Sequence, residues 1–386
     1  MKKHIFLIAG EASGDNLASR LMKEIKNSEG EDIFFSGVGG EKMEAEGLAS
    51  IFPMSELSLL GFVELIPHIP HLLKRIEQTA DAIISLKPDA VVTIDAPAFN
   101  NRVIKKLKEK QPDIEIPLIH YVAPTVWAYK AHRAEKISKL YDHLLCLLPF
   151  EPPYFEKENL PATFIGHPIT EVSTLDYDDK FLIDSGFTKD NLTLSIMIGS
   201  RSGEIKRLFP VFSKTVKLLS KKYNNLQTII LSTDRFHKEL EELSANWPTN
   251  NIVVSDKNEK YSAAKFSDVA LAKSGTGSIE LSLNGTPVVI AYKVNPISAM
   301  MLKRMLQVDF VNLINIILNR EVIPECLQKE CNPDFIANRL SNLLDSEENR
   351  KIQLDQVENA LIELGKGQEI APSKKAANIV LSLIKD

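Results

Sequence analysis

Short hydrophobic runs alternate with amphipathic helical patterns along the first half of the chain. A continuous apolar run between turn residues is typical of a strand that is buried on both faces. Such runs predict strands at residues 4–10, 33–38, 89–94, 117–122, 143–148 and 162–165. Helical patterns lie between them, for example at residues 72–86, 101–110 and 131–140. This alternation predicts a parallel sheet with helices on both faces.

The second half of the chain repeats the pattern. Apolar runs predict strands at residues 192–197, 228–231, 252–254, 269–272 and 287–291. A 3.6-residue period through Leu208, Phe212, Val216 and Leu219 predicts a helix. We expect Pro210 in the first turn of that helix, because an interior proline breaks a helix. From residue 333 onward the pattern is helical and carries no strand signal.

The chain is long enough for two domains, since single cores stop growing beyond about 250–300 residues. It has 386 residues, of which 44% are hydrophobic and 25% charged. Residues 171–184 are polar and acidic without a clear period, and we interpret them as a linker. We therefore predict an α/β protein with two doubly wound parallel-sheet domains, at residues 1–170 and 185–332, followed by C-terminal helices at 333–386.

Composition narrows the class of protein. The formal net charge of −5 argues against a general nucleic-acid binder. The three cysteines show neither metal-ligand spacing nor a disulfide framework, which fits a reducing cytosol. No stretch offers the roughly 20 uninterrupted apolar residues of a transmembrane helix. Residues 57–73 are apolar but interrupted by Glu64, Pro67 and Pro70, and they form either ordinary core or a surface patch for a membrane or acyl chains.

Loops that could carry chemistry follow two predicted strands of the first half. Residues 10–15 read Gly-Glu-Ala-Ser-Gly-Asp and lead into a helical pattern. Ser13 and Asp15 are good N-cap residues, and the glycines also let an anion approach bare backbone at the helix start. Asp95 follows the strand at 89–94, where a carboxylate can serve as a general base, although turn formation and helix capping also explain this loop.

An aromatic segment that begins with a histidine overlaps the end of the strand at 117–122 and continues beyond it. It runs from His120 to Tyr129 and is followed by the basic residues Lys130, His132, Arg133, Lys136 and Lys139. These charges form either a solvated helix face or a contact for a phosphate or an anionic membrane. His167 follows the last strand of this half, where a lone histidine is more often structural than catalytic.

Two glycine loops follow strands of the second half. The first loop comprises residues 199–204, and its Arg201 can pair with phosphate oxygens. In the second, the N–H groups of residues 274–277 can bind a diphosphate where a helix begins. Glu280 lies about one turn into that helix and can accept hydrogen bonds from ribose hydroxyls, unless the segment is only a capped helix with a solvated carboxylate.

Several common catalytic motifs are absent from the sequence. There is no Walker-type Gly-Lys-Ser/Thr, no His-Glu-x-x-His, no Cys-x-x-Cys and no Asp-x-Asp after a strand. We therefore expect neither ATP hydrolysis nor a protein-bound metal ion.

Taken in order, these motifs resemble those of the lipid-A-disaccharide synthase family. The segments that carry the resemblance are residues 10–15, 94–97, 120–128, 164–168, 199–204 and 274–280. Each motif alone is weak, whereas the combination is specific. Two positions depart from the family pattern: Ile198 stands where a proline usually precedes Gly-Ser-Arg, and Ala98 stands where a second aspartate usually follows Asp-x-Pro.

The resemblance implies a GT-B glycosyltransferase that inverts the anomeric centre and needs neither a metal ion nor a cofactor. It implies glycosyl transfer from UDP-2,3-diacylglucosamine to 2,3-diacylglucosamine 1-phosphate, with release of UDP. It also implies a cytoplasmic enzyme that binds peripherally to the inner membrane of a Gram-negative bacterium. For the C-terminal helices it implies either packing back on the first domain or exchange in a homodimer.

The resemblance also implies roles for individual residues. Asp95 is the expected base, which takes the proton of the acceptor's 6-hydroxyl. The expected donor-binding residues are Gly199, Ser200, Arg201, Ser274, Gly275, Thr276, Gly277, Glu280 and Asn315. The residues expected at the acceptor or in a cleft between the domains are Ser13, Gly14, Asp15 and His120. Two alternatives stay open: another GT-B UDP-sugar enzyme, such as a UDP-GlcNAc 2-epimerase, and a non-catalytic regulator that binds nucleotide sugars.

Overall fold

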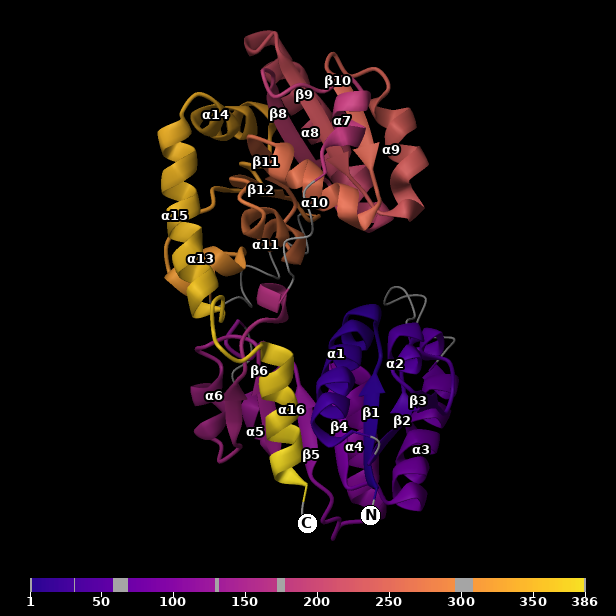
Figure 1. Ribbon diagram of the computed structural model, residues 1–386. Helices are drawn as coiled ribbons and strands as arrows, with labels where there is room; N and C mark the ends of the chain where they lie inside the picture. The colour runs from indigo at the N-terminus through magenta and orange to yellow at the C-terminus, as the bar shows by residue number, and fades with distance from the viewer. Residues whose placement is uncertain are drawn as a thin grey trace. The chain divides into compact units, whose positions relative to one another are not determined.

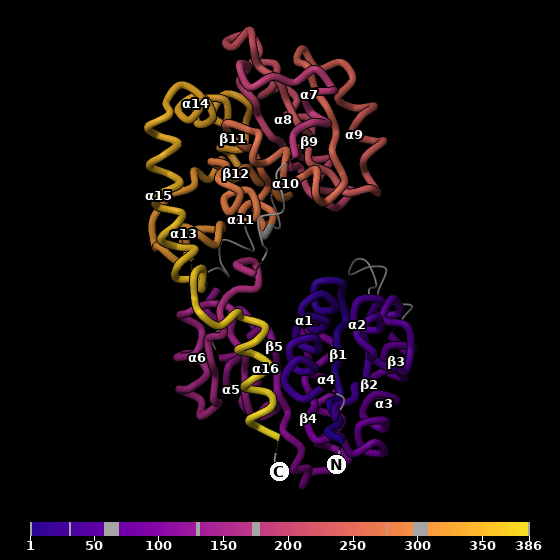
Figure 2. Tube along the Cα trace, viewed as in Figure 1, coloured from indigo at the N-terminus to yellow at the C-terminus, as the bar shows by residue number. Residues whose placement is uncertain are grey.

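The chain divides into two compact units (Figure 1). The computed structural model describes residues 2–30, 32–57, 69–128, 132–171, 178–295 and 308–384. The first unit comprises Met1–Glu171 together with Leu364–Asp386, and the second comprises Val172–Glu363. The chain therefore returns to the first unit at its C-terminal end, and Figure 2 shows the yellow last helix in the same unit as the indigo N-terminal elements.

A seven-stranded parallel sheet forms the centre of the first unit, in the order β3-β2-β1-β4-β5-β6-β7. Its strands are β1 (Lys3–Ala9), β2 (Ile33–Val38), β3 (Leu48–Ser50), β4 (Ala90–Ile94), β5 (Leu118–Tyr121), β6 (His143–Cys146) and β7 (Ala162–Phe164). Its helices are α1 (Ala12–Glu29), α2 (Glu41–Ala45), α3 (Ile69–Leu86), α4 (Pro97–Lys110), α5 (Arg133–Ser138), α6 (Pro152–Glu156) and α16 (Pro372–Leu383). Because neighbouring strands are parallel, their carboxyl ends share one edge of the sheet.

Helices cover both faces of this sheet, and β1 shows how. Its side chains alternate in direction, as the period of a strand requires. Ile5 and Leu7 belong to the core formed with α1, α2 and α16. Phe6 and Ile8 belong to the core formed with α3, α4, α5 and α6. A strand that is apolar on both sides is thus explained by burial on both sides.

The second unit contains a six-stranded parallel sheet in the order β10-β9-β8-β11-β12-β13. The strands are β8 (Leu192–Met197), β9 (Leu226–Leu231), β10 (Asn250–Val254), β11 (Val269–Ala272), β12 (Val288–Tyr292) and β13 (Glu325–Leu327). The helices are α7 (Lys180–Asp184), α8 (Ser202–Lys222), α9 (His237–Ser244), α10 (Lys257–Phe266), α11 (Thr276–Leu283), α13 (Leu313–Leu318), α14 (Pro333–Leu344) and α15 (Glu347–Glu363). The main core of this unit joins the sheet to α8 and α14.

The expected position of Pro210 is wrong. It lies inside α8, well beyond the first turn. A proline there removes the bond to the carbonyl four residues earlier, that of Lys206. Both Pro210 and Lys206 are exposed, so water can satisfy that carbonyl. The buried positions Leu208, Phe212 and Val216 continue through the proline and hold the helix against the sheet.

The C-terminal helices divide between the units. Helices α14 and α15 belong to the second unit, whereas α16 packs on α1 in the first. The returning chain meets the segment after β7, where the His167 N–H donates to the Leu364 carbonyl at 2.7 Å. A Cβ atom placed on Gly166 would lie 2.9 Å from Cγ of Pro372, so this contact needs a glycine. Burial lowers the pKa of His167 to about 4, which agrees with a structural histidine.

The predicted fold class is confirmed: both units are doubly wound parallel α/β domains. The short strands β3 and β13 were missed by the sequence analysis. Part of the segment interpreted as a linker is helical, because α7 occupies its last five residues. Residues 58–68 of the apolar stretch lie outside the described residues, as does Lys130. In the parts of the chain that the structure describes, no helix is both long and apolar enough to cross a membrane.

Candidate active site

In the first unit, the loops after β1 and β4 touch at the carboxyl edge of the sheet. A Cβ atom placed on Gly10 would lie 2.7 Å from Cβ of Ala96, closer than two such atoms come in proteins. A Cβ atom on Gly14 would lie 3.3 Å from the Ile94 carbonyl oxygen. The glycine loop therefore provides room for the loop that carries Asp95, and this role was not foreseen in the sequence.

Asp95 lies in this contact in an unusual backbone conformation. Its φ is +51° and that of Ala96 is +42°, the left-handed region that non-glycine residues rarely adopt. The Ser13 hydroxyl donates to Oδ2 of Asp95 at 3.1 Å, and the side chain of Asn100 donates to the Asp95 carbonyl at 2.7 Å. The Asp95 side chain is half-buried, so it can reach a ligand at this edge. Strained backbone of this kind clusters at functional sites.

Asp15 contacts the start of α2, after β2, and its predicted place near the acceptor stays a prediction. Its buried carboxylate accepts hydrogen bonds from the N–H groups of Gly40, Lys42 and Met43, at 2.9, 3.2 and 3.1 Å. These groups belong to the start of α2, so Asp15 caps that helix. We expected Ser13 or Asp15 as the N-cap of α1, which is wrong. Glu11 occupies the N-cap position, and Ser13 and Asp15 lie in the first turn of the helix.

His120 is not at the edge of the sheet, which contradicts the role predicted for it. Its side chain is fully buried in β5 and its Nδ1 lies 2.7 Å from the Thr93 hydroxyl. The ring stacks on Tyr141 with the ring centroids 4.8 Å apart, and its Nε2 has no hydrogen-bond partner. Burial lowers the pKa of His120 to about 4. The histidine is therefore a neutral part of the core.

The aromatic segment after β5 is bound to the loop after β6. The indole N–H of Trp127 donates to Oε1 of Glu151 at 3.1 Å, and the N–H groups of Leu147 and Leu148 donate to its Oε2. Burial raises the pKa of Glu151 to about 7. Lys139, directly after α5, forms an exposed ion pair with Glu135 of that helix, so part of the basic series is a solvated helix face.

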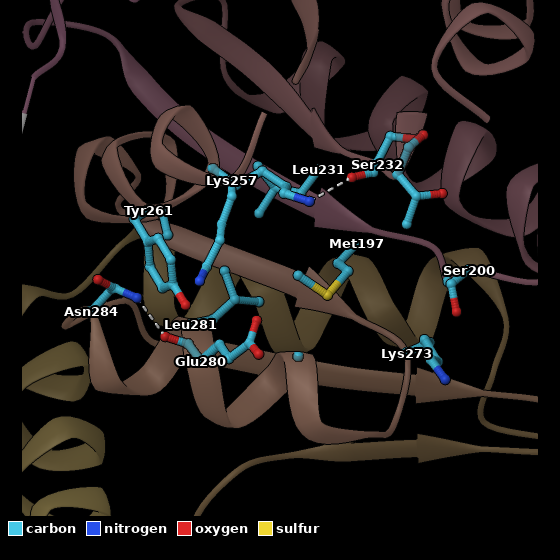
Figure 3. Close-up of a pocket in the computed structure, with 15 residues that line it drawn as sticks. Met197, Ser200, Leu231, Ser232, Lys257, Tyr261, Lys273, Glu280, Leu281 and Asn284 are labelled. Carbon is cyan, nitrogen blue, oxygen red and sulfur yellow. Dashed lines mark hydrogen bonds between the residues drawn. The ribbon is translucent and has the colours of Figure 1, made fainter. Parts of the chain in front are cut away.

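In the second unit, a pocket of about 390 Å³ lies at the carboxyl ends of the strands (Figure 3). That volume is typical of sites for small organic ligands. The pocket brings together four of the predicted donor-binding residues, Gly199, Ser200, Gly277 and Glu280. A Cβ atom on Gly277, in the first turn of α11, would collide with the sulfur of Met197, so the methionine side chain would have to move. The residues that line the pocket are Met197, Gly199, Ser200, Leu231, Ser232, Thr233, Lys257, Lys260, Tyr261, Ala264, Lys273, Gly277, Glu280, Leu281 and Asn284.

Three lysines line this pocket, and the sequence analysis proposed none of them. Lys257 and Lys260 come from α10, and Lys273 follows β11 directly. Burial raises the pKa of the Glu280 carboxyl, and the charges of Lys260 and Lys257 oppose this rise. The spacing of Lys257, Lys260 and Tyr261 places them on one face of a helix, which is the signal that could have identified them.

The other expected donor residues lie outside the lining. Arg201 is exposed and directly precedes α8. The Ser274 hydroxyl donates to the Val311 carbonyl at 3.2 Å, and Gly275 is exposed just before α11. Thr276 begins α11, and its side chain lies outside the described part of the structure.

Asn315 is a structural residue, contrary to our expectation. It is fully buried, and its Oδ1 accepts hydrogen bonds from the N–H groups of Val322 and Ile323. Its Nδ2 donates to the Ile323 carbonyl and to Oε1 of Glu325. The amide therefore has partners on both of its polar atoms, which join α13 to β13.

Comparison with known proteins decides the family. The family described as lipid-A-disaccharide synthetase matches residues 5–380. The lipid-A-disaccharide synthase of Rhodospirillum centenum is 44% identical over 382 residues, which are 98% of this chain and 94% of that protein. That of Rickettsia prowazekii is 40% identical over 382 residues, 98% of each chain. The chain belongs to the lipid-A-disaccharide synthase family. It is therefore a glycosyltransferase of lipid A biosynthesis.

Solved structures support the fold. A UDP-GlcNAc 2-epimerase from Neisseria meningitidis bound to UDP-GlcNAc is similar with a TM-score of 0.61 at 12% identity, covering 99% of each chain. The glycotransferase of kitacinnamycin has a TM-score of 0.64 at 14% identity and covers 100% of each chain. MurG of Acinetobacter baumannii has a TM-score of 0.58 at 12% identity and covers 98% of this chain and 99% of its own. At such identities the likeness shows the GT-B fold alone.

The burial of His120 predicts a pH-dependent stability. Because the pKa of His120 is about 4 in the folded protein and near 6.5 in the unfolded chain, the unfolded state binds a proton first as the pH falls through this window. The free energy of unfolding therefore falls as the pH is lowered from 6.5 to 4. We expect His120→Asn, whose amide can still bond Thr93, to lose less unfolding free energy between pH 7 and pH 5 than the wild type. Urea titrations at both pH values measure this, and equal losses would contradict it.

Proposed function

We propose that the enzyme transfers the sugar of UDP-2,3-diacylglucosamine to the 6-hydroxyl of 2,3-diacylglucosamine 1-phosphate. A bond forms between that oxygen and the anomeric carbon of the donor, and the bond from this carbon to the diphosphate breaks. The hydroxyl proton goes to Asp95, and the electron pair leaves with UDP. The configuration at the anomeric carbon inverts, because a single displacement occurs from the opposite face. The observation that supports this best is the pocket of the second unit, in a chain that belongs to the family.

The donor's nucleotide would bind in that pocket. The Glu280 carboxylate, at its wall, is suited to accept hydrogen bonds from the two ribose hydroxyls. Gly199 and Gly277 line the pocket, and their backbone N–H groups are suited to a diphosphate. Arg201 follows Ser200, and its exposed guanidinium is a further group that we propose for the leaving phosphate.

The acceptor would bind at the contact between the loops after β1 and β4. The Ser13 hydroxyl bond fixes one oxygen of the Asp95 carboxylate, which leaves the other for the acceptor's hydroxyl. Because Ala98 replaces the family's usual second aspartate, Asp95 is the sole carboxylate of its loop.

We also propose that the enzyme is cytoplasmic and acts at the surface of the inner membrane, since both substrates carry acyl chains. Two apolar side chains at the start of α3 support this: Ile69 is 43% exposed and Leu73 is 56% exposed. Lys74 follows them and can meet anionic lipid headgroups. Exchange of the C-terminal helices in a homodimer stays a prediction.

A product assay tests the function. Purified enzyme with both acylated sugars should form the disaccharide 1-phosphate and equimolar UDP in the presence of EDTA, because the proposed mechanism uses no metal ion. Mass spectrometry detects the disaccharide, and a coupled assay detects UDP. UDP release without acceptor would point to a 2-epimerase or a hydrolase, and loss of activity in EDTA that is restored by Mg²⁺ would contradict metal independence.

Replacement of the proposed base should affect turnover and not folding. We expect Asp95→Asn to lower kcat by about 10²- to 10⁴-fold, the usual contribution of general base catalysis. The matched control is Ser13→Ala, which removes the hydrogen bond to Asp95 but leaves the carboxylate. It should lower kcat by about tenfold or less. Wild-type turnover in a normally folded Asp95→Asn variant would exclude Asp95 as the base.

A further inference from the structure

We propose that Lys273 binds the diphosphate of the donor and that Glu204 holds the Lys273 ammonium group in place. This inference rests on the proposed function, because it takes the pocket of the second unit as the site for UDP. It adds a phosphate-binding residue that the motif analysis did not include.

Lys273 lies between the two glycine loops. It follows β11 directly and lines the pocket, and its side chain is 23% exposed. Its Nζ lies 3.2 Å from Oε1 of Glu204, a carboxylate on the first turn of α8 that is only 7% exposed. The other oxygen of Glu204 accepts the N–H of Ser200 at 3.2 Å. One buried carboxylate thus fixes both the ammonium group after β11 and the main chain of the loop after β8.

The other two lysines lie elsewhere in the pocket. Figure 3 shows Lys273 and Ser200 on one side of Met197, and Lys257, Tyr261 and Glu280 on the other. The ammonium group of Lys260 donates to the Ser232 carbonyl at 3.0 Å, so it is held at the end of β9. A nucleotide whose ribose binds Glu280 would therefore direct its diphosphate toward Lys273.

The charges at this end of the pocket suit a phosphate. An ammonium group has three N–H donors, and Glu204 accepts one, which leaves two for phosphate oxygens. Half-burial strengthens such a charged bond, because less water screens it. The bond to Glu204 holds the lysine ammonium group in position, so a phosphate gains a positioned donor rather than a freely moving side chain.

The test separates the phosphates from the rest of the nucleotide. Lys273→Gln removes the charge, yet its amide can still donate to Glu204 and keep the loops together. We expect its affinity for UDP, measured by isothermal titration calorimetry, to fall about 10- to 100-fold, as for the loss of a charged hydrogen bond. Affinity for uridine should stay within about twofold, because uridine carries no phosphate. Lys273→Arg, which keeps the charge, should retain more affinity for UDP than the glutamine variant.

The matched control is Lys257→Gln, on the other side of the pocket. It should not change the ratio of the UDP and uridine affinities, because we place no phosphate near it. An unchanged ratio of the UDP and uridine affinities in Lys273→Gln would overturn the inference. If both affinities fall equally, the lysine is structural. Lys273→Met replaces the glutamine variant if that one does not fold. If Glu280→Gln weakens UDP binding while the uncharged Lys273 variant (Gln or Met) binds UDP normally, the inference fails and the proposed donor site stands. If the wild type does not bind UDP, the proposed function itself fails.

Discussion

The missing side chains of a few glycines are the constraint on which the candidate sites depend. At the carboxyl edge of the first sheet, Gly10 lets the loop of Asp95 come within a distance that any Cβ atom would prevent. At the corresponding edge of the second sheet, Gly199 lies against Glu204 and Gly277 against Met197. In the first unit the absence of a side chain brings the loop after β1 onto the loop after β4, and in the second unit it lets the first turn of α11 pack on the last residue of β8. Parallel pairing places these loops at one edge, and the glycines let them meet there.

Each contact positions a charged group. In the first unit, strained backbone and the Ser13 hydroxyl fix the Asp95 carboxylate at the surface. In the second, the buried Glu204 carboxylate holds Lys273 and the amide of Ser200. A fixed group binds or reacts more strongly than a mobile one, because less entropy is lost when the ligand arrives. The proposed base and the proposed phosphate-binding residues therefore rest on the same kind of packing.

The sequence was most informative where burial alone determines structure. Apolar runs predicted β1, β2 and β8 closely, because a strand inside a doubly wound fold is apolar on both faces. Strands β3 and β13 have only three residues each and give too little pattern to detect. Four predicted donor-binding residues, Gly277 among them, line the pocket of the second unit, and their role there stays a prediction. The internal hydrogen bonds of Asp15, His120 and Asn315 were not predicted, because a sequence does not show which hydrogen bonds a polar side chain makes in three dimensions. Lys257 and Lys260 were missed because surface lysines are common and only the fold brings them to the pocket.

A crystal structure of the enzyme with UDP is the most direct test of this account. We expect the diphosphate between the loops after β8 and β11, within hydrogen-bond distance of the Lys273 ammonium group, and the ribose hydroxyls at the Glu280 carboxylate. UDP bound at any other place on the second unit, or bound in this pocket with its phosphates away from both glycine loops, would contradict it.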